Sequence, residues 1–384
     1  MTMVEAGATQ INPIVLVAGG TGGHVFPAEA LAGALRAKGH TLALLTDSRG
    51  AAWTGALGDV TTHPIRAGPV TGVALGRRLK GMMDLALGGL QSRLLLRRLA
   101  PSVVIGFGGY TTVPAILAAA SLKLPTMIHE QNALLGRANR LLAPRASAIA
   151  TSFADVLRLR DEDHHKVVRT GNPVRAAFRE LRDRPYVEPR RGGEIHLLVT
   201  GGSQGARVFS KVVPDAMERL SGDARQRIRL AQQCRPEDLD EVRARYHHMG
   251  LDAEVAPFFD DLARRLDRAH LVICRAGAST IAELTTAGRP SILVPYAHAA
   301  DDHQTHNARA IADGGGAELI AEADFMPVVL AARLKLMLDQ PRTLGAMAAA
   351  AKLAGHGDAA DSLARLVARL IATGENDDDG REAA

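Results

Sequence analysis

The sequence predicts an α/β fold with two similar domains, each built on a mainly parallel sheet covered by helices on both faces. The first observation behind this prediction is a pair of glycine-rich turns, residues 19–24 and 201–207, about half a chain apart. Each turn directly follows an apolar strand and opens an amphipathic helix, as in Rossmann-like domains. The second observation is that apolar strands alternate with helices of roughly 10–15 residues. The two domains are therefore expected to face each other across a cleft.

The N-terminal half contains the predicted elements in the order that such a domain requires. The elements are a strand at 14–18, a helix at 27–38 that stops at Gly39, strands at 41–45, 102–105 and 126–129, and a segment of helical spacing at 75–99. Residues 99–122 carry no charge over 24 positions, but they contain glycines and Pro114 and are better interpreted as a strand, a turn and a helix than as a membrane span.

The C-terminal half repeats this pattern after a connecting segment. Residues 171–193 are rich in Pro, Arg and Gly and form the predicted linker between domains 1–170 and 194–358. The elements of the second domain are strands at 195–199, 271–273 and 291–295, helices at 206–220 and 279–287, and a turn at 275–278. A last helix at about 359–373 is expected to pack back on the first domain, and residues 374–384 are expected to form a disordered acidic tail.

Composition narrows the class of protein. Only 3% of the 384 residues are aromatic, which is too few for the stacking platforms of single-stranded nucleic-acid binders, so no nucleic-acid partner is expected. Cys234 and Cys274 have no zinc or CxxC spacing, which fits a reducing compartment. No signal peptide is visible, and the chain is expected to be cytosolic. The formal charge is +5, but the acidic tail contributes −4, so the body carries +9 and favours anionic partners such as nucleotides or phospholipid surfaces.

The first glycine-rich turn offers an anion site and a candidate base. The turn does not match GxGxxG, because Val25 occupies the third glycine position, and no Gly-Lys-Ser/Thr follows it. Its backbone N–H groups and the following helix can face an anion. His24 is either a helix-terminal residue without a chemical role or, as a neutral imidazole, a group that takes a proton from a hydroxyl.

Two polar clusters stand out in the second half. Ser279 and Thr280 open a helix and can cap it or bind phosphate, and Glu283 shares their helix face and could accept both hydroxyls of a ribose. Residues 296–307 gather His298, His303 and His306 with two carboxylates. Their spacing matches no standard metal site, so sugar hydroxyls are the favoured ligands and a metal is the alternative.

Seven ordered motifs resemble one family. These are Gly19-Gly-Thr-Gly-Gly-His24, Gly106-Phe-Gly-Gly-Tyr110, His129-Glu-Gln-Asn132, Gly171-Asn-Pro-Val-Arg175, Gly201-Gly-Ser-Gln-Gly-Ala206, Arg275-x-Gly-Ala278 with Glu283, and Asp302-His-Gln304 with Asn307. In this order they are similar to the MurG family, the bacterial N-acetylglucosaminyltransferases of glycosyltransferase family 28 that convert lipid I to lipid II. The resemblance covers about residues 14–370, while the acidic tail is not part of the family pattern.

The resemblance implies a GT-B fold, in which the N-terminal domain binds the lipid I acceptor and the C-terminal domain binds most of UDP-GlcNAc. GlcNAc would pass with inversion to the 4-hydroxyl of MurNAc, on the cytoplasmic face of the inner membrane, during peptidoglycan synthesis. His24 would be the catalytic residue, Glu283 would hold the ribose and Gln304 the GlcNAc hydroxyls. The implied donor contacts are Thr21, Gly22, Gly23, Asn132, Arg175, Ser203, Phe259, Ala278, Ser279, Thr280, Ile281, Ala282, Glu283 and Gln304. Phe259 stands where a smaller aliphatic residue can occur in the family.

The chemistry of such a transfer agrees with the residues present. An inverting transfer needs a base on the acceptor oxygen, support for an oxocarbenium-like carbon and stabilisation of the departing pyrophosphate. Backbone amides and helix dipoles can provide the last of these, so neither a metal nor a cofactor is expected. Two alternatives stay open: a non-hydrolysing UDP-GlcNAc epimerase, which would need no lipid acceptor, and a nicotinamide dehydrogenase, which the missing fingerprint disfavours.

Residues 75–99 are expected to bind a membrane surface. Leucines and methionines recur at helical spacing and are flanked by basic residues, with Asp84 as the single acid: Leu79, Met82, Met83, Leu87, Leu90, Leu94, Arg77, Arg78, Lys80, Arg93, Arg97 and Arg98. Such a helix can attach reversibly to an anionic leaflet. The alternative is a helix whose apolar face packs into the core.

Overall fold

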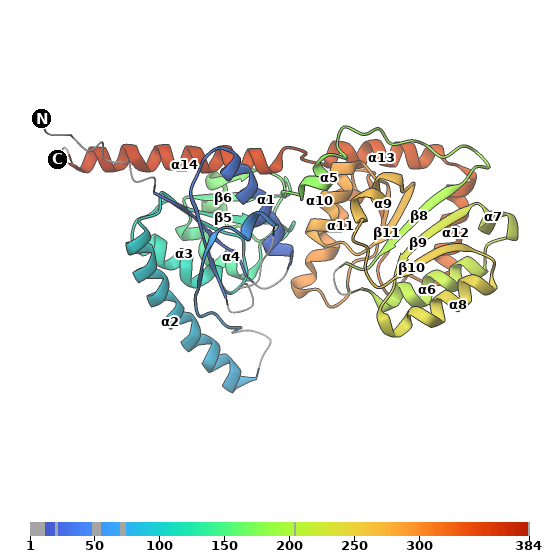
Figure 1. Ribbon diagram of the computed structural model, residues 1–384, viewed down its shortest axis with the longest axis horizontal. Helices are drawn as coiled ribbons and strands as arrows, with labels where there is room; N and C mark the ends of the chain where they lie inside the picture. The colour runs from blue at the N-terminus through green and yellow to red at the C-terminus, as the bar shows by residue number, and fades with distance from the viewer. Residues whose placement is uncertain (1–11, 20–21, 48–54, 70–73, 203–204, 383–384) are drawn as a thin grey trace, which may run out of the picture.

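The computed structural model describes residues 12–19, 22–47, 55–69, 74–202 and 205–382. They form two parallel-sheet domains that lie side by side, joined by a linker and by the C-terminal helix (Figure 1). This confirms the α/β fold with two Rossmann-like domains.

The N-terminal sheet has, within the described residues, seven strands in the order β3-β2-β1-β4-β5-β6-β7, and all neighbouring pairs are parallel. The strands are β1 (Ile14–Val17), β2 (Leu42–Thr46), β3 (Thr61–Pro64), β4 (Val103–Gly106), β5 (Thr126–Glu130), β6 (Ala148–Thr151) and β7 (Val167–Arg169). The helices are α1 (Gly22–Ala37), α2 (Leu75–Leu99), α3 (Thr112–Ser121) and α4 (Arg137–Leu142), with short 3-10 turns η1 (Gly55–Leu57), η2 (Ala143–Arg145) and η3 (Asp161–Lys166).

Both faces of this sheet are buried because successive strand residues enter different cores. Ile14 and Leu16 of β1 pack with α1 and with Leu363 and Val367 of the C-terminal helix, whereas Val15 and Val17 pack with α3 on the opposite face. Successive side chains of a strand point to opposite faces of the sheet, so a strand that is covered on both faces must be apolar at every position. This explains the uninterrupted Ile-Val-Leu-Val run of β1. The uncharged segment 99–122 is β4, a glycine turn and α3, as predicted.

The C-terminal sheet has six parallel strands in the part of the domain that the structure describes, in the order β10-β9-β8-β11-β12-β13. The strands are β8 (Ile195–Thr200), β9 (Ile228–Gln233), β10 (Asp252–Ala256), β11 (Leu271–Cys274), β12 (Ser291–Leu293) and β13 (Ala317–Leu319). The helices are α6 (Arg207–Glu218), α7 (Gly222–Gln226), α8 (Leu239–His248), α9 (Leu262–Arg268), α10 (Ala278–Ala287), α11 (His303–Ala312), α12 (Pro327–Asp339) and α13 (Arg342–Ala354), with 3-10 turns η4 (Pro236–Asp238) and η5 (Ala300–Asp302).

Two segments connect the domains. The linker contains the short helix α5 (Ala176–Arg179), which contacts α10. The last helix, α14 (Ala359–Glu382), runs from the C-terminal domain along the N-terminal domain (Figure 1) and packs against α1. It begins where the last helix was expected and extends beyond the expected end at about residue 373.

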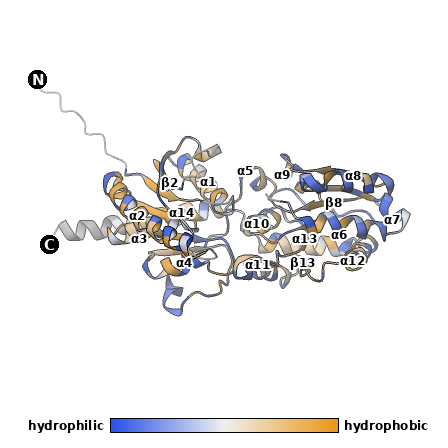
Figure 2. Ribbon diagram, turned by 90° about the horizontal axis from the view of Figure 1, so that it is seen from below, coloured by the Kyte–Doolittle hydropathy of each residue, from blue (hydrophilic) through white to orange (hydrophobic). Residues whose placement is uncertain are grey.

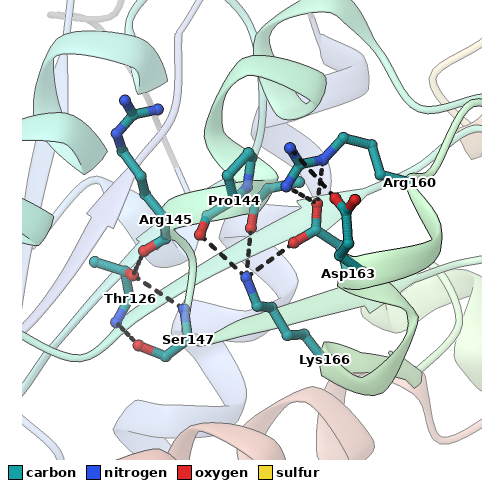
Figure 3. Close-up of polar contacts among 9 residues, drawn as sticks. Thr126, Pro144, Arg145, Ser147, Arg160, Asp163 and Lys166 are labelled. Carbon is teal, nitrogen blue, oxygen red and sulfur yellow. Dashed lines mark hydrogen bonds and ion pairs between the residues drawn. The ribbon is translucent and has the colours of Figure 1, made fainter.

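A buried carboxylate fixes the chain between β6 and β7. Asp163 accepts hydrogen bonds from Arg160 and Lys166, both at 2.9 Å, and Lys166 also donates to the carbonyl oxygens of Ala143 and Pro144 (Figure 3). The hydrogen bonds from Arg160 are the largest cause that lowers the pKa of Asp163. Asp163 therefore has a structural role.

Candidate functional site

The first glycine-rich turn lies at the carboxyl end of β1, in the middle of its sheet. Gly19 follows this strand, and a Cβ atom there would lie 2.5 Å from the Thr111 hydroxyl oxygen, so a side chain cannot be accommodated. Helix α1 begins at Gly22, not near residue 27 as predicted, so Gly22 and Gly23 form its first turn and present N-terminal amides. Thr21 lies outside the described residues.

His24 lies in this first turn of α1, against the turn that follows β4. A Cβ atom on Gly108 would come within 3.2 Å of His24 Nε2, and one on Gly109 within 3.5 Å of Nδ1, so both glycines leave room for the imidazole. Within the described residues, His24 Nδ1 is buried without a hydrogen-bond partner. Burial lowers the pKa of His24; a polar contact with the Gly19 backbone opposes this effect, and the nearby His303 lowers the pKa further. The net shift is downward, so the ring is neutral at pH 7 and able to accept a proton.

A second site element is the loop after β5, which is organised by the buried carboxylate of Glu130. This carboxylate accepts hydrogen bonds from the backbone N–H groups of Asn132 and Gly136 at 3.0 and 2.8 Å and from the side-chain amides of Asn132 and Asn139 at 3.1 and 2.8 Å. Burial raises the pKa of Glu130, while the hydrogen bonds lower it. The sequence identified this loop through Asn132 but gave no role to Glu130.

Asn307 of α11 joins this loop to the C-terminal domain. Its side chain accepts from the Ala133 N–H at 2.8 Å and donates to Asn132 Oδ1 at 3.0 Å and to the Ala276 carbonyl at 3.2 Å. Asn307 is fully buried. One amide therefore links the predicted donor contact Asn132 to the turn that precedes α10.

Arg175 of the linker meets Glu283 of α10 at the border between the domains. Its guanidinium donates to Glu283 at 3.0 Å and lies over the rings of Phe26 and Phe178, 4.9 and 4.7 Å from their centroids. Burial raises the pKa of Glu283, and the Arg175 charge opposes that rise. These two predicted site residues, far apart in sequence, are direct neighbours.

The run 278–283 is divided between two faces of α10. Ala278, Ile281 and Ala282 line a cavity of about 280 Å³ together with residues of the N-terminal domain and linker, such as Phe153 and Asn172. Helical geometry places the predicted contacts Ser279, Thr280 and Glu283 on a different face. Ser279 Oγ is buried and has no hydrogen-bond partner among the described residues.

Gln304 lies on α11 beside the start of α10. Its side-chain oxygen accepts from the backbone N–H groups of Ala276 and Tyr296, at 3.2 and 3.0 Å, so it joins the turns after β11 and β12.

The remaining predicted donor contacts are Phe259 and Ser203. Phe259 is a buried core residue with Arg265 stacked 4.0 Å from its ring centroid, and Ser203, in the turn after β8, lies outside the described residues.

The histidines and carboxylates of residues 296–307 do not converge on one point. Asp301 pairs with arginines, Asp302 accepts from Thr305 at 2.7 Å, and His303 Nδ1 contacts the Ala300 carbonyl. In the part of the chain that the structure describes, no three His, Cys, Asp or Glu side chains form a group that could hold a metal ion. The same part of the chain contains no helix long and apolar enough to cross a bilayer.

The two domains match two family models. Residues 14–151 match the glycosyltransferase family 28 N-terminal domain, and residues 196–363 match the glycosyltransferase family 28 C-terminal domain. The chain belongs to glycosyltransferase family 28. Together the two matches contain the turn after β1, the loop after β5, α10 and α11, while Arg175 lies in the linker between the matched ranges.

Two similar curated proteins have the same name. A protein of Rhodospirillum centenum is 54% identical over 92% of this chain and 93% of its own length, and one of Rhizobium etli CIAT 652 is 46% identical over 94% and 96%. Both are named UDP-N-acetylglucosamine--N-acetylmuramyl-(pentapeptide) pyrophosphoryl-undecaprenol N-acetylglucosamine transferase. This identity confirms the resemblance to the MurG family.

Solved structures agree with this assignment. The crystal structure of Acinetobacter baumannii MurG superposes with a TM-score of 0.73 at 30% identity and covers 93% of this chain and 99% of that one. A UDP-GlcNAc 2-epimerase from Neisseria meningitidis bound to UDP-GlcNAc has a TM-score of 0.63, but at 12% identity it shows only a shared fold.

Proposed function

We infer that this chain transfers GlcNAc from UDP-GlcNAc to the MurNAc residue of undecaprenyl-pyrophosphoryl-MurNAc-pentapeptide, producing lipid II and UDP for peptidoglycan synthesis. The observation that carries this inference is the 46–54% identity, over more than nine tenths of the chain, to transferases named for this reaction. The epimerase alternative shares only the fold, and the first turn lacks the fingerprint that a nicotinamide enzyme would need.

The donor occupies the C-terminal domain and the face of α10 that carries Glu283. A carboxylate buried beside Arg175 is a strong acceptor for two ribose hydroxyls, because little water competes for it. Ser279 supports this placement, since its hydroxyl is buried and has no partner in the described residues. The N-terminus of α10 supplies backbone N–H groups and a positive dipole end for the diphosphate.

The acceptor hydroxyl is deprotonated by His24. Two features support this role: burial keeps the imidazole neutral, and Gly108 and Gly109 leave room for its ring. A neutral imidazole near the acceptor oxygen can take its proton as the glycosidic bond to UDP breaks. The amides of Gly22 and Gly23, at the start of α1, would contact the donor from the N-terminal domain.

The N-terminal domain docks on the anionic cytoplasmic leaflet through α2. The helix turns Gly81, Gly88 and Ser92 inward and is anchored to the core by Leu96 near its C-terminal end, while most of its large apolar residues before Leu95 are exposed. Leu79, Met83, Leu90 and Leu94 are 58–62% exposed. This arrangement is opposite to that of a core-facing helix and fits a surface that lies in the headgroup region of a bilayer.

Figure 2 shows α2 at the end of the molecule away from the C-terminal domain, with apolar and polar residues side by side. Arg77, Arg78 and Arg97 are exposed beside the apolar residues, and Lys80 is exposed and paired with Asp84 at 2.8 Å. Basic side chains around an apolar ridge favour an anionic lipid surface. The enzyme would then reach its polyprenyl-linked acceptor without extracting it from the membrane.

The direct test is to incubate the purified protein with UDP-GlcNAc and lipid I and to measure the mass of the lipid product. Addition of one GlcNAc supports the proposal. Conversion of UDP-GlcNAc without lipid I, or no product with both substrates, contradicts it.

A parallel reaction in EDTA tests metal dependence. Retained activity is expected if backbone amides stabilise the pyrophosphate, and complete loss of activity that a divalent ion restores would contradict that mechanism.

A further inference from the structure

The carboxylate of Asp301, in the C-terminal domain, lies among three arginines of the N-terminal domain. Arg137 donates to both oxygens, from Nε at 3.2 Å and from Nη2 at 3.0 Å, and Arg140 donates from Nη2 at 3.1 Å. Arg158 Nη1 lies 3.3 Å away. The Asp301 side chain is 18% exposed, so solvent only partly screens these ion pairs.

The backbone at this contact adopts an uncommon conformation on both sides. Asp301 and Asp302 both have φ of 54°, and Arg158 has φ of 62°. Residues with a Cβ atom enter this left-handed region rarely and stay there when their surroundings hold them. The hydrogen bonds from Arg137 and the charges of all three arginines lower the pKa of Asp301 to about 2, although burial opposes them. The carboxylate is therefore ionised at any working pH.

The segment that Asp301 anchors leads directly into site residues. His303, two positions later, is close enough to His24 to lower the pKa of that imidazole. Gln304 fixes the amides of Ala276 and Tyr296, and Asn307 bonds to Asn132 and Ala133 of the opposite domain. The start of α11 is therefore held on the N-terminal domain at two places, through ion pairs at residue 301 and through an amide at residue 307.

We propose that Asp301 is a positioning residue for the transfer reaction: its ion pairs with Arg137, Arg140 and Arg158 hold the start of α11 against the N-terminal domain, so that His303 and Gln304 meet the His24 side of the site. Asp301 does not touch the reacting groups itself. The contact is between charges on separate domains, so it weakens as ionic strength rises. Its role in transfer rests on the function proposed above, whereas the interdomain contact can be tested without any substrate.

Asp301→Asn is the test variant, and Asp302→Asn is its matched control. Asparagine tolerates the left-handed conformation, so both variants keep the backbone and remove one charge. The two aspartates have the same φ, but Asp302 accepts from Thr305 of its own helix and not from the arginines. Arg137→Gln is a second test variant that breaks the contact from the N-terminal domain without changing the loop.

The measurement is hydrogen–deuterium exchange of the full-length protein in the absence of substrates, at 50 and 500 mM NaCl. We expect Asp301→Asn and Arg137→Gln to speed exchange about fivefold or more in residues 132–142 and in residues 300–307, because each variant frees both sides of the contact. Asp302→Asn should affect residues 300–307 only. High salt should move the wild-type protein towards the two test variants.

Unchanged exchange at residues 132–142 in Asp301→Asn, or the same change in Asp302→Asn, would overturn the proposal. Lipid I turnover provides a separate readout: kcat/KM of Asp301→Asn should fall about tenfold at 50 mM NaCl and the difference from wild type should shrink about fivefold at 500 mM. A deficit that does not depend on salt would refute the ionic mechanism. Absence of transfer by the wild-type protein would instead refute the proposed function and leave the exchange result intact.

Discussion

Arg175, in the linker, donates a hydrogen bond to Glu283 of α10 at 3.0 Å while its guanidinium lies over Phe26 of α1. One side chain thus touches both domains and the predicted ribose acceptor. Burial raises the pKa of Glu283, and the charge and hydrogen bond of Arg175 oppose that rise.

Replacing Glu283 with Ala should weaken UDP-GlcNAc binding. The ribose loses a charged acceptor worth about 1.5–3 kcal/mol, which corresponds to a rise in Kd of about 10- to 150-fold. Isothermal titration calorimetry measures this directly. Glu318→Gln is the control, because Glu318 is also a carboxylate paired with an arginine, Arg333, at 2.7 Å, but lies on β13. Equal donor affinity in wild type and Glu283→Ala would remove Glu283 from the donor site.

His24→Ala should lower turnover by about 10²- to 10⁴-fold with little change in donor affinity, because a general base contributes to the chemical step. In the wild-type enzyme the rate should fall as pH drops through the pKa of His24, which lies below 6.5 because of burial and His303. His303→Gln should move this acid limb to higher pH. A pH–rate profile measures both effects, and near-normal turnover of His24→Ala would assign the base elsewhere.

The N-terminal domain should lose stability between pH 6.5 and 4 because of His129. This side chain is fully buried, contacts the Gly171 carbonyl through Nε2 at 3.1 Å, and has a pKa lowered by burial to about 4. The unfolded chain binds a proton in that window and the folded protein does not, so stability falls as pH falls, by about 2 kcal/mol between pH 7 and 5.

Urea unfolding at the two pH values tests this effect in His129→Gln, which keeps a donor for Gly171 and cannot titrate. The variant should lose less stability than wild type on acidification. His248→Gln, on the exposed surface of α8, controls for removal of an imidazole. Identical pH dependence in His129→Gln and wild type would show that His129 does not cause the loss.

The adjacent glycines Gly88 and Gly89 of α2 should respond in opposite directions to alanine. A Cβ atom at residue 88 would lie 1.9 Å from the Arg66 carbonyl oxygen, whereas nothing lies within 4 Å of one at residue 89. Gly88→Ala should cost about 1–3 kcal/mol by overpacking, and Gly89→Ala should gain about 0.5–1 kcal/mol of helix stability. Thermal unfolding of both variants measures the difference, and equal melting temperatures would contradict the packing described for α2.

Reversing the charges of Arg77, Arg78 and Lys80 to Glu should release the protein from vesicles that contain anionic phospholipid. Each basic residue contributes about 1 kcal/mol near such a surface, so three reversals should lower binding well over tenfold. Co-sedimentation at low and high salt measures the effect. Glu substitutions at Lys211, Arg219 and Arg342, all exposed in the C-terminal domain, match the change in net charge. If both triple variants bind alike, α2 does not contact the membrane.

Leu79→Ser with Met83→Ser tests the apolar part of the same surface. Both side chains are exposed, so folding should be unaffected while vesicle binding falls. Binding equal to wild type would limit the attachment to electrostatics.

Local sequence patterns were sufficient to predict the bounds of several helices and strands. The bounds of α2 are those of the helical spacing, and β1, β2, β4 and β5 lie within one residue of prediction, because strands buried on both faces are continuous apolar runs. Strands with a weaker apolar pattern were not predicted: these are β3, β6, β7, β9, β10 and β13, of which β3 and β10 are edge strands with several exposed residues. The prediction placed the start of α1 too late because Gly22 and Gly23 have low helix propensity. These glycines belong to the turn after β1.

The sequence alone determined the two-domain α/β class, the family and the loops that carry the site, because each depends on residue types at fixed spacing along the chain. Only the tertiary structure decided which distant residues meet: Arg175 with Glu283, Asn132 with Asn307, and Asp301 with three arginines. It also decided that α2 turns Gly81 and Gly88 inward and leaves Leu79, Leu90 and Leu94 exposed. Periodicity defines a face of a helix, but only the neighbouring chain, here the Arg66 carbonyl against Gly88, determines which face has room to be buried.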